Sequence, residues 1–236
     1  MIKFNKHLVT LSRFIYPWTC KLCGETDNVD LGVCKDCISI LPWCRRACYQ
    51  CGLPIHTSSN ERLLCGQCLK KPPMFDHLHA ALWYQPPISQ LITDYKYFQR
   101  WENARCLIGL FAMTIPVMPA DARLVPMPSH ARRIRERGFN AVYECLRFLN
   151  KQISVKYDQT LLKRANYTET QTGKTKPQRR KNVKNAFRVT RPIDNEKIIL
   201  FDEVVTTGAT VDEASKQLKK AGASNVEVWC IARTVR

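Results

Sequence analysis

The sequence has no apolar run of about 18 residues, the minimum for a membrane-spanning helix. It also lacks the long apolar segment and small-residue cleavage site of a secretory signal peptide, because its start, MIKFNKHLVTLSRFIYPW, has only a modest apolar stretch. We therefore expect a cytoplasmic protein, with peripheral association with the inner membrane left open. Hydrophobic residues make up 45% of the 236 residues, which supports a globular core and argues against wholesale disorder.

Acidic residues are scarce. The chain has 20 Asp and Glu against 37 Lys and Arg, which gives a formal charge of +17. Such an excess attracts polyanions, namely nucleic acid, phosphorylated ligands or an anionic membrane surface. The alternative is a soluble protein that avoids aggregation through its net charge. We favour nucleic acid because the positive charge is clustered.

Twelve cysteines are distributed unevenly, with nine before residue 70. Eight of these form four C-x-x-C pairs: Cys20/Cys23, Cys34/Cys37, Cys48/Cys51 and Cys65/Cys68. In a protein without a secretion signal this pattern favours metal over disulfides. Each pair supplies two thiolates from one tight turn, and Zn²⁺ takes four tetrahedral ligands at about 2.3 Å. The simplest pairing is sequential: the first four cysteines form one site and the last four form the other.

The ninth cysteine, Cys44, lies four residues before Cys48 and could compete with it as a ligand. Iron–sulfur clusters and redox dithiols are the rival interpretations, but four regular pairs in series favour structural zinc. Closed four-cysteine sites have no open position for substrate. We therefore predict two zinc ions that act as scaffolds.

Three parts follow from the composition: an N-terminal segment, 1–17; a cysteine-rich module, 18–72, ending near KKPPMF; and a larger domain, 73–236. In the larger domain, strand-like and helix-like patterns alternate, which predicts an α/β fold with a mostly parallel sheet flanked by helices. Strands are expected at 77–85, 123–128, 197–201 and 225–235, and helices within 88–115, 140–152 and 211–221. Much of the polar segment 158–187 reads as a long functional loop.

The stretch KIILFDEVVTTGAT, residues 197–210, combines a buried strand, two acids and a hydroxyl-rich turn before a helix. Backbone N–H groups at a helix N-terminus are unpaired and carry partial positive charge, so a phosphate fits there. Gly208 allows a sharp turn, and α/β proteins bind ligands at the carboxyl ends of their strands. The alternative is a simple helix cap with solvated threonines.

Asp202 and Glu203 would repel a phosphate at direct contact. They are better suited to accept hydrogen bonds from the hydroxyls of a sugar, or to hold Mg²⁺, a few ångströms away. A phosphate beside a vicinal diol indicates a ribose 5-phosphate.

Basic residues crowd two segments. Arg132, Arg133, Arg135 and Arg137 precede Gly138, and Arg133 and Arg137 share a face if that segment is helical. The second segment has no acid, and its basic residues are Lys174, Lys176, Arg179, Arg180, Lys181, Lys184, Arg188 and Arg191. Two roles fit: neutralising a pyrophosphate or following a nucleic-acid backbone. The candidates for this role are Arg133, Arg137, Lys174, Arg179, Arg180 and Lys181.

Three aromatic residues, Phe139, Tyr167 and Phe187, interleave with these charges, and single-stranded bases stack on such rings. The alternative is that Phe139 and Phe187 anchor the core. Four isolated histidines have no ligand spacing beyond one H-x-H, so we expect structural or surface roles for them: His56, His77, His79 and His130.

The strand, the two acids and the threonine-rich turn resemble the signature of type I phosphoribosyltransferases. That resemblance implies a phosphoribosyl pyrophosphate site at Asp202, Glu203, Val204, Thr206, Thr207, Gly208, Ala209 and Thr210. In it the two acids contact the ribose hydroxyls and the turn contacts the 5-phosphate, with Mg²⁺ as a further cofactor. Two residues depart from the usual pattern: Glu203 replaces an Asp, and Phe201 replaces a smaller aliphatic residue.

Two further segments, VPMPSHARRIRERGFN and TQTGKTKPQRRKNVKNAF, resemble elements of the ComF competence proteins, which also carry a cysteine-pair module first. The resemblance implies a small double zinc ribbon before a type I phosphoribosyltransferase-like domain. It also implies binding and handling of single-stranded DNA during natural transformation, with competence helicase and DNA-processing proteins as candidate partners. Two alternatives stay open: an active phosphoribosyltransferase on an unknown acceptor, and a zinc-ribbon adaptor that recruits uptake proteins.

Overall fold

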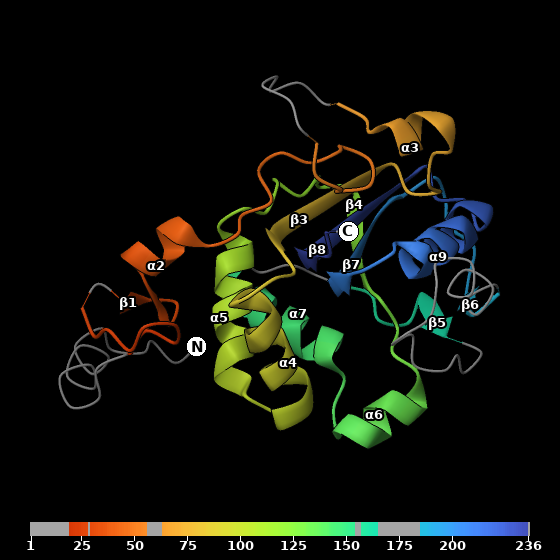
Figure 1. Cartoon of the computed structure of the whole chain (residues 1–236). Helices are drawn as coiled ribbons and strands as arrows, with labels where there is room; N and C mark the ends of the chain where they lie inside the picture. Colours follow the sequence, from red (N-terminus) through yellow and green to blue (C-terminus); the bar gives the residue numbers. More distant parts are fainter. Residues whose placement is uncertain (1–18, 28, 56–62, 154–156, 165–184, 236) are drawn as a thin grey trace.

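A four-stranded sheet forms the centre of the computed structural model, which describes residues 19–27, 29–55, 63–153, 157–164 and 185–235 (Figure 1). The strand order is β3-β8-β7-β4, and every neighbouring pair is parallel. The strands are β3 (His77–Trp83), β4 (Ala122–Pro126), β7 (Lys197–Val205) and β8 (Asn225–Arg233). The predicted parallel α/β architecture is confirmed.

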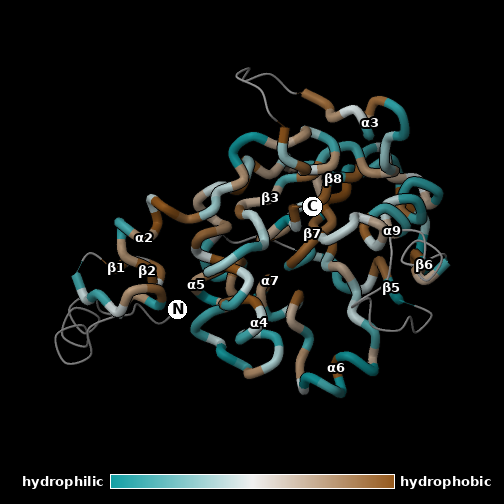
Figure 2. Tube along the Cα trace, viewed as in Figure 1, coloured by the Kyte–Doolittle hydropathy of each residue, from teal (hydrophilic) through white to brown (hydrophobic). Residues whose placement is uncertain are grey.

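Helices cover both faces of this sheet. Alternation along β7 places Ile199 and Phe201 in one core and Ile198 and Leu200 in the other. The first core includes residues of α4 (Ile88–Phe98), α5 (Trp101–Ala112) and α7 (Ala141–Ile153). The second includes residues of α9 (Ala209–Lys220) and of the antiparallel pair β5 (Leu162–Arg164) and β6 (Phe187–Val189). Burial on both faces explains the apolar runs within β7 and β8, which are brown in Figure 2.

In four places the elements differ from the sequence predictions or decide a point that they left open. The helical stretch 88–115 is two helices, because Gln99 ends α4 in a left-handed conformation with φ of 54°. Strand β7 continues to Val205, so the two acids lie within the strand rather than after it. The basic segment before Gly138 is a helix, α6 (Ala131–Arg137). Strands β5 and β6 occupy the described ends of the segment expected to be a loop.

The cysteine-rich module has two parts. The first contains β1 (Val29–Asp30), β2 (Val33–Cys34) and α2 (Lys35–Ile40), and it packs against α5: a Cβ on Gly109 would lie 2.8 Å from Leu31 Cδ2. The second contains α3 (Gly66–Lys70) and contacts β3, where the rings of Tyr49 and His77 stack at 4.1 Å. The proposed division at residues 18 and 73 stays a prediction, and 1–17 lie outside the described residues. Within the described residues, no helix combines the length and apolarity needed to cross a membrane.

His79 gives the stability of the fold a pH dependence. It lies on β3 among aromatic rings, its Nε2 is 3.2 Å from Thr114 Oγ1, and burial lowers its pKa from 6.5 to about 4. Between those values the unfolded chain binds a proton that the folded chain does not, so stability falls as pH falls. We expect the free energy of unfolding to drop by about 2 kcal/mol between pH 8 and pH 5 from this residue alone. Urea unfolding of the wild type and His79→Gln should show a flatter pH dependence in the variant, and equal slopes would contradict this assignment.

Candidate functional site

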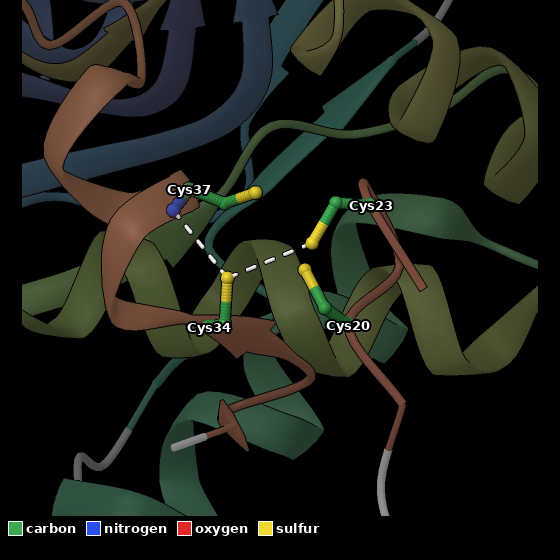
Figure 3. A group of neighbouring side chains, drawn as sticks. All are labelled: Cys20, Cys23, Cys34 and Cys37. Carbon is green, nitrogen blue, oxygen red and sulfur yellow. Dashed lines mark hydrogen bonds between the residues drawn. The ribbon is translucent and has the colours of Figure 1, made fainter. Parts of the chain in front are cut away.

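The first cysteine cluster brings together Cys20, Cys23, Cys34 and Cys37, whose sulfur atoms converge as Figure 3 shows. All four Sγ atoms lie within 4.8 Å of one another, and those of Cys23 and Cys34 are 3.7 Å apart. A tetrahedron with Zn–S bonds of about 2.3 Å has edges of about 3.8 Å, so the spacing fits zinc. Burial acts to raise the pKa of Cys20, but backbone N–H hydrogen bonds outweigh it and lower the pKa to about 6.

The second cluster contains Cys48, Cys51, Cys65 and Cys68 and has the same geometry. The Sγ atoms of Cys51 and Cys65 are 3.6 Å apart, and the Cys65 amide donates to Cys48 Sγ at 3.2 Å. A hydrogen bond from Cys51 and several backbone amides lower the pKa of Cys48 to about 4. These are the two sets of four that sequential pairing predicts. Cys44 belongs to neither set, and its amide donates to Ala81 O on β3.

A pocket of about 340 Å³ lies at the carboxyl ends of β3, β4 and β7. It gathers seven of the candidate residues that the sequence predicts: Arg133, Arg137, Asp202, Glu203, Val204, Thr206 and Thr210. The other three turn residues shape the start of α9. Gly208 has φ of 80°, a conformation that favours glycine, and Thr207 Oγ1 accepts from the Ala209 amide at 3.3 Å.

The two acids in the pocket have different surroundings. Glu203 is buried, and its Oε2 lies 3.2 Å from Lys96 Nζ on α4. Burial acts to raise its pKa, but the charges of Lys96 and Arg137 and hydrogen bonds hold the pKa of Glu203 below its ordinary value. Burial and the neighbouring Glu203 raise the pKa of Asp202 well above its ordinary value. Glu203 therefore carries the charge that Lys96 balances, and Asp202 is the acid left to meet a ligand.

Helix α6 supplies the positive wall of the pocket. Arg133 and Arg137, one helical turn apart, both line it, whereas Arg132 and Arg135 are exposed. The end of α6 is held against the end of α4, because Gln99 Nε2 donates to Arg137 O at 3.3 Å. The Arg137 guanidinium also lies 5.4 Å from the centre of the Tyr97 ring.

The pocket-lining residues that the sequence analysis missed include Lys96, Tyr97 and Arg164. Burial, and then the charge of Arg133, lower the pKa of Arg164 to about 10, and its guanidinium lies 5.4 Å from the centre of the Phe187 ring. All three come from elements distant in the chain. No local pattern distinguishes Lys96 from an ordinary solvated lysine on an amphipathic helix.

The proposed stacking role of two aromatics is wrong. Phe187 is 4% exposed within the second core, and Phe139 packs against Tyr95 and Trp101 with ring centres 5.4 and 4.6 Å away. Both anchor the fold. The most exposed of the described rings nearby are Tyr97 and Phe98 at the end of α4, which are 63% and 69% exposed.

The remaining predicted residues divide in two. His77 and His79 contact neighbours inside the fold, and His130 caps α6 by accepting from the Arg132 amide at 3.1 Å, as expected for structural or surface histidines. Six of the other candidates lie outside the described residues: His56, Tyr167, Lys174, Arg179, Arg180 and Lys181.

Comparison of the sequence with known proteins identifies relatives of this chain. The family model for the double zinc ribbon domain matches residues 11–69. The chain is 34% identical to the DNA utilization protein YhgH of Escherichia coli O157:H7 over 224 residues, which cover 92% of this chain and 96% of that protein. It is 28% identical to Competence protein F of Haemophilus influenzae over 231 residues, which cover 92% and 98% of the two chains.

Two solved structures are distant matches, each with a TM-score of 0.38. One is the allosteric regulatory enzyme of purine biosynthesis, at 17% identity, and the other is the glutamine phosphoribosylpyrophosphate amidotransferase of B. subtilis, at 16%. Each match covers 59% of this chain and 30% of the solved chain. We take no function from matches this distant.

The double zinc ribbon match and the two clusters agree. The cysteine-rich module holds two structural zinc sites, each closed by four thiolates.

Proposed function

This chain belongs to the ComF family of competence and DNA-utilization proteins, and from that premise we propose that it binds and handles single-stranded DNA during DNA uptake. We propose further that its pocket holds a phosphoribosyl pyrophosphate-type ligand. The observation that carries the second proposal is the joining in one pocket of an acid, two threonines and two arginines.

Each group in the pocket suits one part of such a ligand. Thr206, Thr210 and the amides at the start of α9 offer donors to a phosphate, and Asp202 offers an acceptor to the ribose hydroxyls. Arg133 and Arg137 face the place where a pyrophosphate adds negative charge, and guanidinium groups bind phosphate in a bidentate manner. A Mg²⁺ ion bound with the ligand would draw oxygen ligands from Asp202 and the phosphates and would neutralise their charge.

Isothermal calorimetry with phosphoribosyl pyrophosphate and Mg²⁺ tests the pocket. We expect Asp202→Asn and Thr206→Val each to weaken binding by about tenfold, because Thr206→Val removes a hydrogen bond to a charged phosphate, at about 1.5–3 kcal/mol, and Asp202→Asn removes one of the two carboxyl oxygens offered to the ribose hydroxyls and Mg²⁺. Asp121→Asn is the control, since Asp121 is an exposed acid that pairs with Lys197 at 3.1 Å, away from the pocket. Unchanged affinity in both pocket variants would remove the ligand from this site. Pyrophosphate release with a nucleobase or DNA acceptor would favour the transferase alternative instead.

Within the described chain, the residues best suited to bind a single DNA strand are Tyr97, Phe98, Arg132, Arg135 and Arg137. We call these five residues the strand surface, after the DNA strand. Two consecutive exposed rings stand beside a helix that carries four arginines and one acid. Single-strand binding combines stacking on aromatic faces with a positively charged track for the backbone. Helix α6 is correspondingly hydrophilic in Figure 2.

Among the described acids near this surface, Glu136 and Glu102 are paired, and Asp94 lies one helical turn before Phe98 on α4. Glu136 Oε1 accepts from Arg132 Nε at 2.9 Å. Glu102 lies 4.0 Å from Arg100 and 3.9 Å from Lys21. The local balance therefore stays positive, which favours a polyanion over a protein partner of mixed charge.

Matched variants test the strand surface. We expect the double variant Arg132→Gln, Arg135→Gln to bind single-stranded oligonucleotides of any sequence more weakly than the wild type. The slope of log affinity against log salt concentration should become shallower by about 1.4, at about 0.7 per lost phosphate contact. Arg45→Gln with Arg46→Gln removes the same charge from two other exposed arginines and should change little. Phe98→Leu should weaken binding by about tenfold, and Phe98→Trp should keep it, because stacking contributes about 1–3 kcal/mol per base.

Equal losses in the two arginine pairs would mean that only net charge matters. Binding of anionic vesicles without binding of oligonucleotide would assign this surface to a membrane.

A further inference from the structure

Arg233, the last residue of β8, connects the second cysteine cluster to the turn beside the pocket. Its side chain is nearly enclosed, with the residue 3% exposed. Arg233 Nε donates to the carbonyl oxygen of Cys51 at 3.0 Å. Its Nη1 donates to the carbonyl oxygen of Val205 at 3.1 Å and also to that of Thr206. One guanidinium thus joins a zinc-ligand residue to the residue that opens the threonine-rich turn.

Two features of the backbone produce this contact. Val205 and Arg233 are register partners in the parallel pair β7 and β8, so the arginine emerges beside the turn. On the other side, Gly52 has φ of 65°, and a Cβ there would lie 2.4 Å from Leu78 Cδ2 and 3.7 Å from Arg233 Cδ. Glycine at this position lets the Cys48–Gly52 turn lie directly on the strand ends.

We propose that the second zinc site positions the phosphate-binding turn through Arg233. Zinc fixes the Cys51 backbone, the Cys51 carbonyl fixes the guanidinium, and the guanidinium fixes the carbonyls of Val205 and Thr206. A planar group with several rigidly placed donors can hold carbonyls on both sides at once, which a lysine ammonium on a flexible stem cannot do in the same way. Ligand affinity in the pocket therefore depends on zinc at the second site.

The first zinc site provides the internal comparison. Its cysteines pack in the core with α5 residues such as Cys106 and Leu107. These contacts lead to α5, and the Sγ atoms of the cluster contact one another and the Cys37 amide. Losing zinc there should leave the turn unaffected.

Hydrogen exchange tests this proposal without any ligand. Cys51→Ser and Cys23→Ser change the equivalent cysteine of each site, and zinc analysis should give one remaining ion per chain for each. In Cys51→Ser we expect the amides of Ala209 and Thr234, which donate to Thr207 Oγ1 and Val205 O, to exchange at least tenfold faster than in the wild type, and in Cys23→Ser we expect no change. Equal exchange in the two variants, whether fast or slow, would overturn the link.

A second pair of variants separates positioning from general stability. Arg233→Lys should speed amide exchange in the turn while the zinc content stays at two ions per chain. It should also weaken the binding of phosphoribosyl pyrophosphate by about tenfold. Leu78→Ala loosens the same interface without touching the turn, so it should lower the melting temperature and leave turn exchange near the wild-type rate. Similar turn exchange in both variants would reduce Arg233 to a packing role.

The affinity measurement rests on the proposed function, whereas the exchange measurement does not. Absent ligand binding in the wild type would count against the pocket assignment alone. If Arg233→Lys does not fold, the two cysteine variants still decide.

Discussion

Removal of zinc is expected to unfold the cysteine-rich module and to leave the parallel sheet folded. Small modules closed by cysteines gain their folding free energy from the metal, at about 10–16 kcal/mol per structural site. The helices of the module are short, at six and five residues, and each carries a cysteine of one cluster, so little else holds them. Elemental analysis should give two zinc ions per chain. After a chelator is added, limited proteolysis should cut before residue 70 and spare the strands β3, β4, β7 and β8.

Protease resistance that survives complete loss of zinc would show that packing against α5 and β3 is enough. Iron in place of zinc would restore the iron–sulfur interpretation.

Replacing Arg133 and Arg137 together by Gln is expected to weaken binding of both DNA and phosphoribosyl pyrophosphate, and the affinity for phosphoribosyl pyrophosphate should fall by about 100-fold or more. Both residues line the pocket, and each charge-assisted hydrogen bond contributes about 1.5–3 kcal/mol. Arg137 also belongs to the strand surface through its contact with Tyr97. Calorimetry for the small ligand and fluorescence anisotropy for an oligonucleotide measure the two losses.

The pattern across variants is more informative than any single loss. Asp202→Asn should weaken binding of the small ligand only. Arg132→Gln with Arg135→Gln should weaken binding of DNA only, and replacing Arg133 and Arg137 should weaken binding of both. If the pocket arginines affect the small ligand alone, the two sites do not share Arg137. If Asp202→Asn weakens DNA as strongly, the two ligands occupy one site.

Features that depend on neighbouring residues in the chain could be predicted from the sequence. Each C-x-x-C pair supplies two ligands from one turn, so pairing the four in order required no knowledge of the fold. The strand, acids and turn of 197–210 also form one continuous segment, and alternation with helices indicated a parallel sheet. These predictions used only spacing and residue type.

Features created by tertiary packing could not be predicted in this way. Lys96, Arg164 and Arg233 approach the turn from three separate elements, and nothing in their own segments marks them. The aromatics show the same limit: Phe139 stands beside four arginines in the sequence yet packs inside, whereas Phe98 ends a helix and stays exposed. Strand β7 continues beyond its apolar run, 198–201, because it remains paired with β8 as far as Val205.

The most direct test of the proposed function is an anisotropy titration of wild-type protein against a mixed-sequence single-stranded oligonucleotide at several salt concentrations. We predict binding that weakens steeply with salt, with a log–log slope of at least about 2, because at least three phosphates would be neutralised at about 0.7 each. Duplex DNA of the same sequence should bind more weakly, since paired bases cannot stack on Tyr97 and Phe98. Absent binding, or affinity that does not change with salt, would contradict the DNA-handling function and leave the phosphoribosyltransferase alternative in its place.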